Sequence, residues 1–402
     1  MGYDVLSVRR QFPFFGAQKI AYLDSGATSQ KPQIVIDAVT GALSQASNVS
    51  RGVYPLAEVT TAAYDGARRA VAEFINASPH EIVFVKSATE GINLVARTFG
   101  STLTSGDRIA LSVMEHHANI VPWQQLSSQG IAIDWVGIDT DGQPNMSELE
   151  TILKRGKTRM IAMTGLSNVL GSMPDCADIA RLAHEYGAKL LIDASQLVAH
   201  AMIDVRKIDC DFLVFSGHKL YGPTGIGALY GKTEILESLP PFLGGGDMIQ
   251  AVTEEGFSAA ESPRKFEAGT PPIAEAIGLA TAVEWMHSVG PDAIFAYEDS
   301  MIEHALTSLA GCDGLTILGP RSSQKRKGCI SFTVNGVHPH DLAEVLGRNG
   351  ICIRAGHHCC QPLHRRLGIQ ASARMSIAAY TTKDEIDQLV EAIKKAQKLL
   401  TK

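Results

Sequence analysis

Two short segments hold residue types that can do covalent chemistry on a carbonyl compound. Lys219 directly follows an apolar run and has Ser216 and His218 beside it. A partly desolvated amine with a lowered pKa, next to hydroxyl and imidazole donors, is what Schiff-base chemistry requires. Asp193 ends a neighbouring apolar run. A carboxylate at that position could keep a pyridine nitrogen protonated, so that the ring would withdraw electrons from a substrate carbon.

Two further segments could complete such a site. Residues 87–91 read Ser-Ala-Thr-Glu-Gly before an apolar helical stretch, where free N–H groups and the helix dipole favour a phosphate. His116 follows the apolar run 109–114. Each segment alone also fits a solvated loop or a plain helix cap. Their common position at strand ends predicts one site, because ligands of open α/β sheets bind outside the carboxyl ends of the strands.

The elements that must position these residues alternate along the chain. Short apolar runs separate helix-like periods between about residues 20 and 260, which predicts an α/β fold with a mostly parallel sheet covered on both faces. The expected strands of this sheet are 109–114, 133–138, 160–164, 190–193, 212–216 and 226–230. The expected helices are 34–43, 62–75, 92–98 and 177–184.

After the glycines 244–246 and the prolines 271–272 the pattern changes to long helices and separated strands. It predicts a large domain over 20–265 and a smaller α+β domain formed by 1–19 and 266–402. The small domain should contain strands at 315–318, 329–334, 351–354 and 374–377. Thr382 and Glu385 have the spacing of a capping box and predict the start of the last helix.

Bulk composition excludes several other classes. The 402 residues carry a net charge of −6 from 42 acidic and 36 basic side chains that are interspersed, so nucleic acid and anionic membranes are not expected as partners. We interpret the one basic cluster, Lys325 to Lys327, as a solvated loop. No run approaches the roughly 20 apolar residues of a membrane span. Seven thinly spread cysteines predict free thiols and a cytoplasmic protein.

Longer runs of sequence resemble a known family. They are 193–200, 211–227 around Ser-Gly-His-Lys-Leu-Tyr-Gly-Pro-Thr-Gly, 115–123 starting Glu-His-His-Ala-Asn, 167–171 Ser-Asn-Val-Leu-Gly and 354–359 Arg-Ala-Gly-His-His-Cys. These runs are similar to the group II cysteine desulfurases, the SufS and CsdA branch of the class-V aminotransferase family, which is related to selenocysteine lyases. The similarity extends from Leu23 to the last helix, and runs of this length are far more specific than a short motif.

The resemblance implies a pyridoxal 5′-phosphate (PLP) enzyme of fold type I. Lys219 would bind the cofactor covalently, Asp193 would pair with its pyridine nitrogen, Gln196 would reach its ring hydroxyl and His116 would stack on the ring. The phosphate would be held by Thr89, Ser216 and His218, and by Thr270 from the other subunit of a homodimer. The substrate-binding residues would be Arg374, Asn168 and Arg354.

The implied reaction converts L-cysteine to L-alanine, with the sulfur held as a persulfide on Cys359. His116 would move a proton at that step. A protein of the SufE or SufU kind would then accept the sulfur for iron–sulfur cluster assembly. Selenocysteine lyase and cysteine-sulfinate desulfinase are alternative activities on the same scaffold, and a scaffold protein with a vestigial PLP site is a rival that the presence of Lys219, Asp193 and Cys359 disfavours.

The role of Cys360, next to Cys359, has several interpretations. Cys360 could intercept sulfur, form a vicinal disulfide with Cys359 or simply pack as a thiol. The cluster of 357–360 with His364 has the residue types of a metal site, yet adjacent ligands do not readily face one ion, and no metal is expected. The chain also has Ser50 and Tyr54 where the family commonly has histidine, which leaves substrate handling or partner docking less defined there.

Overall fold

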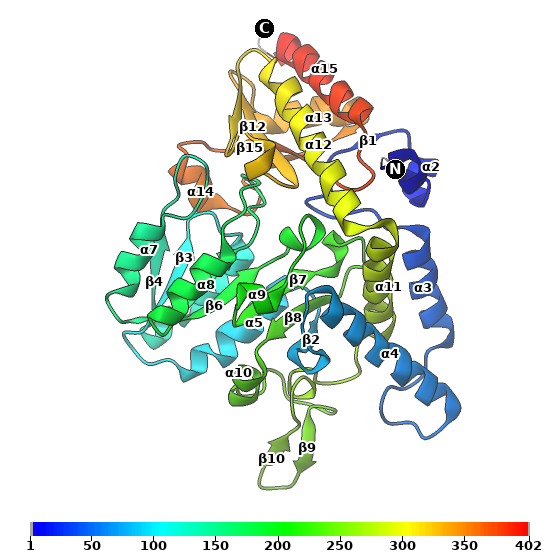
Figure 1. Ribbon diagram of the computed structural model, residues 1–402, viewed down its shortest axis with the longest axis vertical. Helices are drawn as coiled ribbons and strands as arrows, with labels where there is room; N and C mark the ends of the chain where they lie inside the picture. The colour runs from blue at the N-terminus through cyan, green and yellow to red at the C-terminus, as the bar shows by residue number, and fades with distance from the viewer. Residues whose placement is uncertain (1–2, 401–402) are drawn as a thin grey trace.

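A seven-stranded sheet forms the centre of the molecule. The computed structural model describes residues 3–400 (Figure 1). The strands run in the order β2-β8-β7-β6-β5-β3-β4. Their bounds are β2 Ile82–Val85, β3 Arg108–Ser112, β4 Ala132–Val136, β5 Thr158–Thr164, β6 Lys189–Asp193, β7 Phe212–Ser216 and β8 Gly227–Gly231. The strands β7, β6, β5, β3 and β4 pair with their neighbours in parallel. At the other edge β8 pairs antiparallel with both β7 and β2.

Both faces of this sheet are buried, which explains why its strands are apolar throughout. Successive side chains of a strand point to opposite faces, and in β7 Leu213 and Phe215 pack in one core cluster while Phe212 and Val214 pack in another. Helix α5 (Ala88–Thr98) packs against β7 and β8, and α8 (Cys176–Glu185) packs against β6. The helices α3 (Gln33–Gln45), α4 (Pro55–Phe74) and α11 (Ile273–Val289) pack together beside them (Figure 1).

A second sheet lies in the C-terminal part. Its order is β11-β12-β15-β14, all antiparallel. The strands are β11 Leu315–Leu318, β12 Cys329–Val334, β14 Arg354–Gly356 and β15 Ser372–Ser376. The helices α12 (Pro291–Ala310), α13 (Pro339–Arg348) and α15 (Lys383–Leu400) cover it. The predicted capping box of the last helix is confirmed, because Thr382 N–H donates to Glu385 (2.8 Å) and Glu385 N–H donates to the Thr382 hydroxyl (3.3 Å).

Packing crosses the predicted domain limits in two places. Val8 and Phe12, in the N-terminal segment, belong to the core cluster that includes α11 and the large sheet. Ala21 and Leu23 pack instead with the second sheet, where β1 (Ala21–Tyr22) pairs with β13 (Ile351–Cys352). The division at residues 20 and 265 stays a prediction. Through these crossings the N-terminal segment packs against the cores of both sheets.

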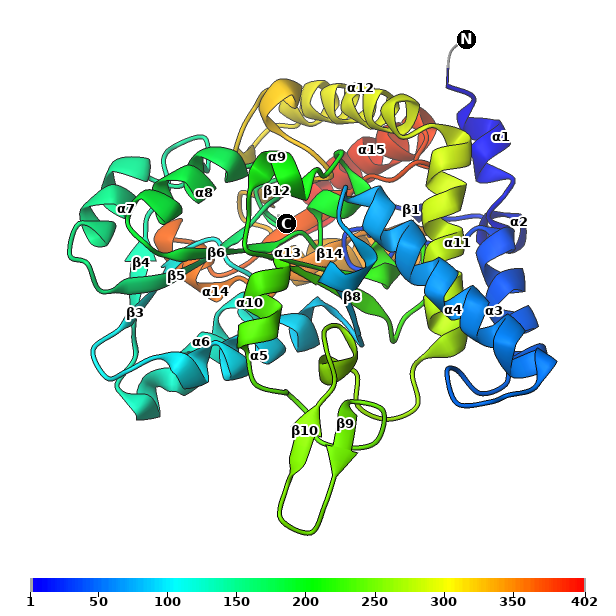
Figure 2. The same cartoon turned by 60° about the horizontal axis from the view of Figure 1, so that its bottom comes forward.

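The ten predicted strands are confirmed to within a few residues, except that the predicted strand 351–354 divides into β13 and β14, which belong to different sheets. The sequence did not predict β2 or the hairpin of β9 (Ile249–Val252) and β10 (Phe257–Ala259), which projects from the body (Figure 2). The hairpin is largely exposed and lacks the buried pattern that identifies a strand, whereas β2 is a four-residue apolar run that is buried throughout. No helix within residues 3–400 is long and apolar enough to cross a membrane.

The interpretation of 325–327 as a solvated loop is wrong for its central residue. Arg326 is fully buried. Its Nε and Nη1 donate to the carbonyls of Pro320 (2.7 Å) and Cys329 (3.0 Å), and its Nη2 donates to that of Leu318. The guanidinium therefore donates to three buried carbonyls, a role that charge patterning cannot reveal.

Arg326→Leu should lower the stability of the protein markedly. The substitution removes three hydrogen bonds to buried carbonyls, and hydrogen bonds of a charged donor contribute about 1.5–3 kcal/mol each. We expect a lower Tm in thermal scans at a fixed rate. Lys325→Leu is the matched control, because its exposed ion pair with Asp141 (2.7 Å) contributes only about 0–1 kcal/mol. Equal Tm values for the two variants would contradict the assignment.

Candidate active site

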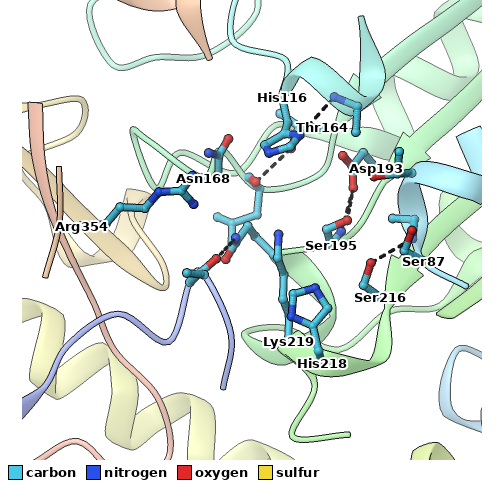
Figure 3. Close-up of a pocket in the computed structure, with 17 residues that line it drawn as sticks. Ser87, His116, Thr164, Asn168, Asp193, Ser195, Ser216, His218, Lys219 and Arg354 are labelled. Atoms are coloured by element: carbon cyan, nitrogen blue, oxygen red, sulfur yellow. Dashed lines mark hydrogen bonds between the residues drawn. The ribbon is translucent and has the colours of Figure 1, made fainter. Parts of the chain in front are cut away.

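One cavity lies at the carboxyl ends of the parallel strands and collects most of the predicted residues. It has a volume of about 210 Å³. Its walls are formed by Gly26, Ala27, Ser87, Ala88, Thr89, His116, Ala118, Thr164, Leu166, Asn168, Asp193, Ser195, Gln196, Ser216, His218, Lys219 and Arg354. Figure 3 shows Lys219 and Asp193 in the same space, with His116 and Asn168 along its rim. The predicted convergence of strand ends is thus a feature of the structure.

Lys219 supplies a buried amine. It stands in the 3₁₀ turn 217–219 that follows β7. Burial is the main cause that lowers its pKa, to about 8, and the nearby Arg374 and Arg354 guanidinium groups act in the same direction. The Asp193 carboxylate opposes them. A substantial fraction of the amine is therefore neutral near physiological pH, which is the form that attacks a carbonyl carbon.

Asp193 is held rigidly at the end of β6. Ser195 donates to its Oδ1 atom twice, from the backbone N–H (3.0 Å) and from the hydroxyl (2.5 Å). Both bonds use the same oxygen, so Oδ2 has no donor of its own within residues 3–400 and is available to a ligand. Gln196 is anchored by its amide, which donates to the Gly26 carbonyl (2.8 Å).

The N-terminus of α5 forms another wall of the cavity. Ser87 caps the helix by accepting a hydrogen bond from Glu90 N–H. The Ser216 hydroxyl accepts from Ala88 N–H (2.8 Å) and so links the end of β7 to the first turn. Thr89 lies on the same turn and lines the cavity. The positive end of the helix dipole and these hydroxyls suit an anionic group such as a phosphate.

Two histidines of the cavity are neutral. Burial, followed by the charge of Lys219, lowers the pKa of both His116 and His218 to about 4. His116 Nδ1 accepts from Ala118 N–H (3.1 Å). Because a neutral imidazole carries one proton, the proton of His116 must lie on Nε2, the nitrogen free to act as a donor.

The loop that carries Cys359 approaches the cavity through Arg354. Arg354 lines the cavity, and its Nη2 lies 3.5 Å from Cys359 Sγ. His358 and Cys359 both have left-handed backbone angles, with φ of 50° and 57°. Asn168 Nδ2 donates to the His358 carbonyl (2.7 Å), and the His117 backbone N–H donates to the Cys359 carbonyl (2.7 Å). The thiol itself is partly exposed.

Arg374 lies just behind the cavity wall. It is 1% exposed. Nη1 donates to the Asn168 carbonyl (2.9 Å), Nη2 pairs with Asp24 (3.1 Å), and Nε has no partner within the described residues. A Cβ added at Gly26 would lie 3.2 Å from Nη2. Gly26 therefore lets the backbone that lines the cavity run directly against the guanidinium.

Eleven of the twelve predicted site residues lie in or immediately behind this cavity. Thr270 does not: it is exposed and lines a separate hollow with Glu267 and Phe242. Cys360 is turned away from Cys359, with its sulfur 3.2 Å from the Met114 carbonyl and 3.3 Å from that of Glu115. All seven cysteines lie within the described residues and are free thiols, as predicted.

Sequence reasoning missed residues that orient the others. They are Asp24, Gly26, Ser195 and Ser372, and each contacts a predicted site residue or the cysteine loop. Asp24 and Gly26 belong to the segment where the family resemblance begins, which was the only available signal. Within residues 3–400 no group of three or more His, Cys, Asp or Glu side chains could hold a metal ion.

Comparison with known proteins identifies the family. Residues 21–389 match the class-V aminotransferase model. The chain is 44% identical to a probable cysteine desulfurase of Streptomyces coelicolor, over 97% of this chain and 96% of the relative, and 44% identical to a cysteine desulfurase of Dickeya dadantii, over 99% and 98%. Its structure matches the cysteine desulfurase CsdA from Escherichia coli with a TM-score of 0.92, at 38% identity and full coverage of both chains.

The chain therefore belongs to the class-V aminotransferase family. Within that family its full-length relatives are cysteine desulfurases. These matches confirm the predicted fold class, the predicted enzyme class and PLP as the cofactor. The residues present fit this group, because the buried amine of Lys219, the open Oδ2 of Asp193 and the helix N-terminus of α5 share one cavity.

Asp193→Asn should lower the pKa of Lys219 further. The carboxylate is the group that favours the protonated amine against the effect of burial, so its loss leaves that effect unopposed. The rate of reductive methylation of Lys219 in cofactor-free protein, followed by peptide mass spectrometry, should reach half its maximum near pH 8 in the wild type and at lower pH in the variant. The exposed Lys86 is the internal reference. An unchanged or higher midpoint for Lys219 would refute the proposed coupling.

Proposed function

We propose that this protein removes sulfur from L-cysteine as a cysteine desulfurase and holds it as a persulfide on Cys359. The observation that carries the proposal is the contact between Arg354 and Cys359, because Arg354 also lines the cavity that holds Lys219 and Asp193. A thiol is thereby held at the mouth of a site with a buried, partly neutral amine. Sulfur transfer needs these two groups close together.

Each cofactor-facing residue has a defined task. PLP, when bound, supplies an electron sink for the charge that develops on the substrate Cα. Lys219 Nζ would hold the cofactor covalently and would accept the proton of the substrate Cα. Asp193 Oδ2 would pair with the pyridine nitrogen, and Gln196 and His116 would position the ring. Ser216, Thr89 and His218 would hold the phosphate.

Binding of the substrate falls to the polar groups on the opposite wall. Arg374 would take the substrate carboxylate as a planar fork, with Asn168 and Arg354 beside it. Arg374 already pairs with Asp24, which fixes the orientation of its guanidinium behind the cavity wall. Its unpartnered Nε is a further buried donor, and a buried donor without a partner is costly unless a ligand satisfies it.

Sulfur transfer balances without an outside oxidant or reductant. The Cys359 thiolate attacks the substrate sulfur, an S–S bond forms and the Cβ–S bond breaks. The electron pair of the broken bond returns to Cβ. This carbon takes up a proton and becomes the methyl group of alanine, which then leaves. Arg354 Nη2 stabilises negative charge on Cys359 Sγ before the attack. His116 can deliver the proton because its Nε2 carries one.

We further propose that the persulfide passes to an acceptor protein of the SufE or SufU kind for iron–sulfur cluster assembly. The partial exposure of Cys359 supports this role.

The protein would act as a homodimer. Apolar side chains are exposed on α3, α4 and the loop between them, notably Leu43, Val53 and Val59 at 74%, 98% and 66%. Thr270, exposed near α4, would complete the partner subunit's phosphate site. A cytoplasmic location stays a prediction.

Cys359→Ser should abolish the formation of both alanine and sulfide from L-cysteine in the presence of a reductant. Serine keeps the shape of the side chain but cannot accept sulfur. Cys360→Ser should retain most activity, because its sulfur faces two carbonyls away from the cavity. Equal sulfide production by Cys359→Ser and the wild type would remove this thiol from the mechanism. The same assay with selenocysteine and cysteine sulfinate separates the alternative activities.

Val59→Glu should convert the dimer to a monomer. Burial of an unpaired carboxylate in an apolar interface has a large desolvation cost, which disfavours association. Light scattering coupled to size-exclusion chromatography measures the mass. Leu399→Glu, at a similarly exposed leucine on α15 (64%), is the control and should leave the mass unchanged. A wild-type protein that is monomeric at micromolar concentration would overturn the dimer proposal.

A further inference from the structure

A chain of buried hydrogen bonds surrounds the nucleophile, and no step described above uses it. His358 Nε2 lies 3.0 Å from Ser372 Oγ, and His364 Nε2 lies 3.0 Å from the same oxygen. His364 Nδ1 lies 2.9 Å from the Cys360 carbonyl. All three side chains are at most 2% exposed. Solvent therefore cannot replace any of these bonds.

The direction of the chain follows from the chemistry of its last member. A carbonyl oxygen only accepts, so the proton of His364 lies on Nδ1 and its Nε2 is a bare acceptor. The Ser372 hydroxyl must then donate to His364 Nε2. Because that hydroxyl has a single proton, it accepts from His358 Nε2–H. Neutral rings are required, and burial lowers the pKa of both histidines, with Arg374, Arg354 and His364 facing His358 and with His357 facing His364.

The two ends of this chain bracket Cys359. His358 precedes the nucleophile and contributes a side chain, whereas Cys360 follows it and contributes a carbonyl. His358 and Cys359 are two consecutive left-handed residues, and this conformation costs about 1–2 kcal/mol for each residue other than glycine. Such a conformation persists only where surrounding contacts determine it.

Ser372 ties this loop to the residue that would bind the substrate. It lies in β15, two positions before Arg374, and alternate residues of a strand point to the same face. The strand pairs with β14, which begins at Arg354. Ser372 thus lies on the strand that carries Arg374 and next to the strand that begins at Arg354, while its hydroxyl contacts the histidine of the cysteine loop.

We infer that Ser372, His358 and His364 are positioning residues that hold the Cys359 thiol at a fixed place relative to Arg374. The catalytic role of these residues rests on the proposed function, whereas the hydrogen-bond network is independent of it. The histidine pair cannot serve as metal ligands while it is engaged in this way, since three of its four ring nitrogens take part in the chain. The fourth, His358 Nδ1, is buried without a partner among the described residues.

The tautomers give the first test. In ¹⁵N-histidine spectra of the cofactor-loaded protein, with signals assigned through His358→Phe and His364→Phe, His358 should carry its proton on Nε2 and His364 on Nδ1. Ser372→Ala should shift both signals, because both rings lose their shared partner. The opposite tautomers, or charged rings at neutral pH, would overturn the chain.

The position of the thiol gives the second test. Ser372→Ala should lower kcat for alanine formation about tenfold to 100-fold, as expected for a displaced reacting group, with little change in KM because Arg374 remains. Iodoacetamide should label Cys359 several-fold faster, while the rate at the partly exposed Cys352 stays constant. Thr98→Val, which removes a buried hydroxyl that donates to the Leu94 carbonyl (2.8 Å), is the control and should change neither rate.

A double variant separates a connected chain from two independent contacts. Ser372→Ala combined with His364→Phe should be no worse in kcat than the more damaged single variant, since either change breaks the same chain. If the kcat losses of the two single variants multiply in the double variant, the inference is overturned. It is also overturned if iodoacetamide labels Cys359 in Ser372→Ala at the same rate as in the wild type. A wild-type protein that forms no alanine would defeat the proposed function, yet the tautomers and labelling rates would still decide the positioning role.

Discussion

The site depends on the exclusion of water from the carboxyl edge of the large sheet. Burial there lowers the pKa of Lys219 to about 8, and it lowers those of His116 and His218 to about 4. An exposed lysine would be almost fully protonated at neutral pH and would not attack an aldehyde carbon. The second sheet and the N-terminal segment close over this edge, so the reactivity of one amine depends on how the whole molecule packs.

The packing of the second sheet over this edge brings the guanidinium groups of Arg354 and Arg374 close to the amine of Lys219. Arg354 and Arg374 both disfavour the protonated form of Lys219, whereas Asp193 favours it. Arg374 is offset by Asp24 and by the Asn168 carbonyl. The segment 23–29 is central to this arrangement, because Gly26 contacts both Gln196 and the Arg374 guanidinium. A short stretch before the first long helix thereby joins Gln196, which lines the cavity, to Arg374 behind its wall.

Cys359, the proposed nucleophile, and its neighbour His358 are held by residues outside 357–360. The Cys359 carbonyl binds His117, His358 binds Asn168 and Ser372, and Arg354 reaches the sulfur. These four partners come from four separate segments of the chain. Cys360, which could have competed for sulfur, instead fixes the loop against the carbonyls of Met114 and Glu115. The difference between the two adjacent thiols is therefore one of orientation, set by a left-handed backbone at Cys359.

The sequence by itself determined the parallel sheet and the convergence of Lys219 and Asp193, because apolar runs identify buried strands and parallel strands end at one edge. Long specific runs added the family, the cofactor and Cys359. Only the tertiary structure decided that Arg326 is a buried link rather than a solvated charge, that Asp24 pairs with Arg374, and that Ser372 joins two histidines. Such partners are 3 to 350 positions apart in the chain, and side-chain hydrogen bonds at such irregular separations leave no periodicity in the sequence to read.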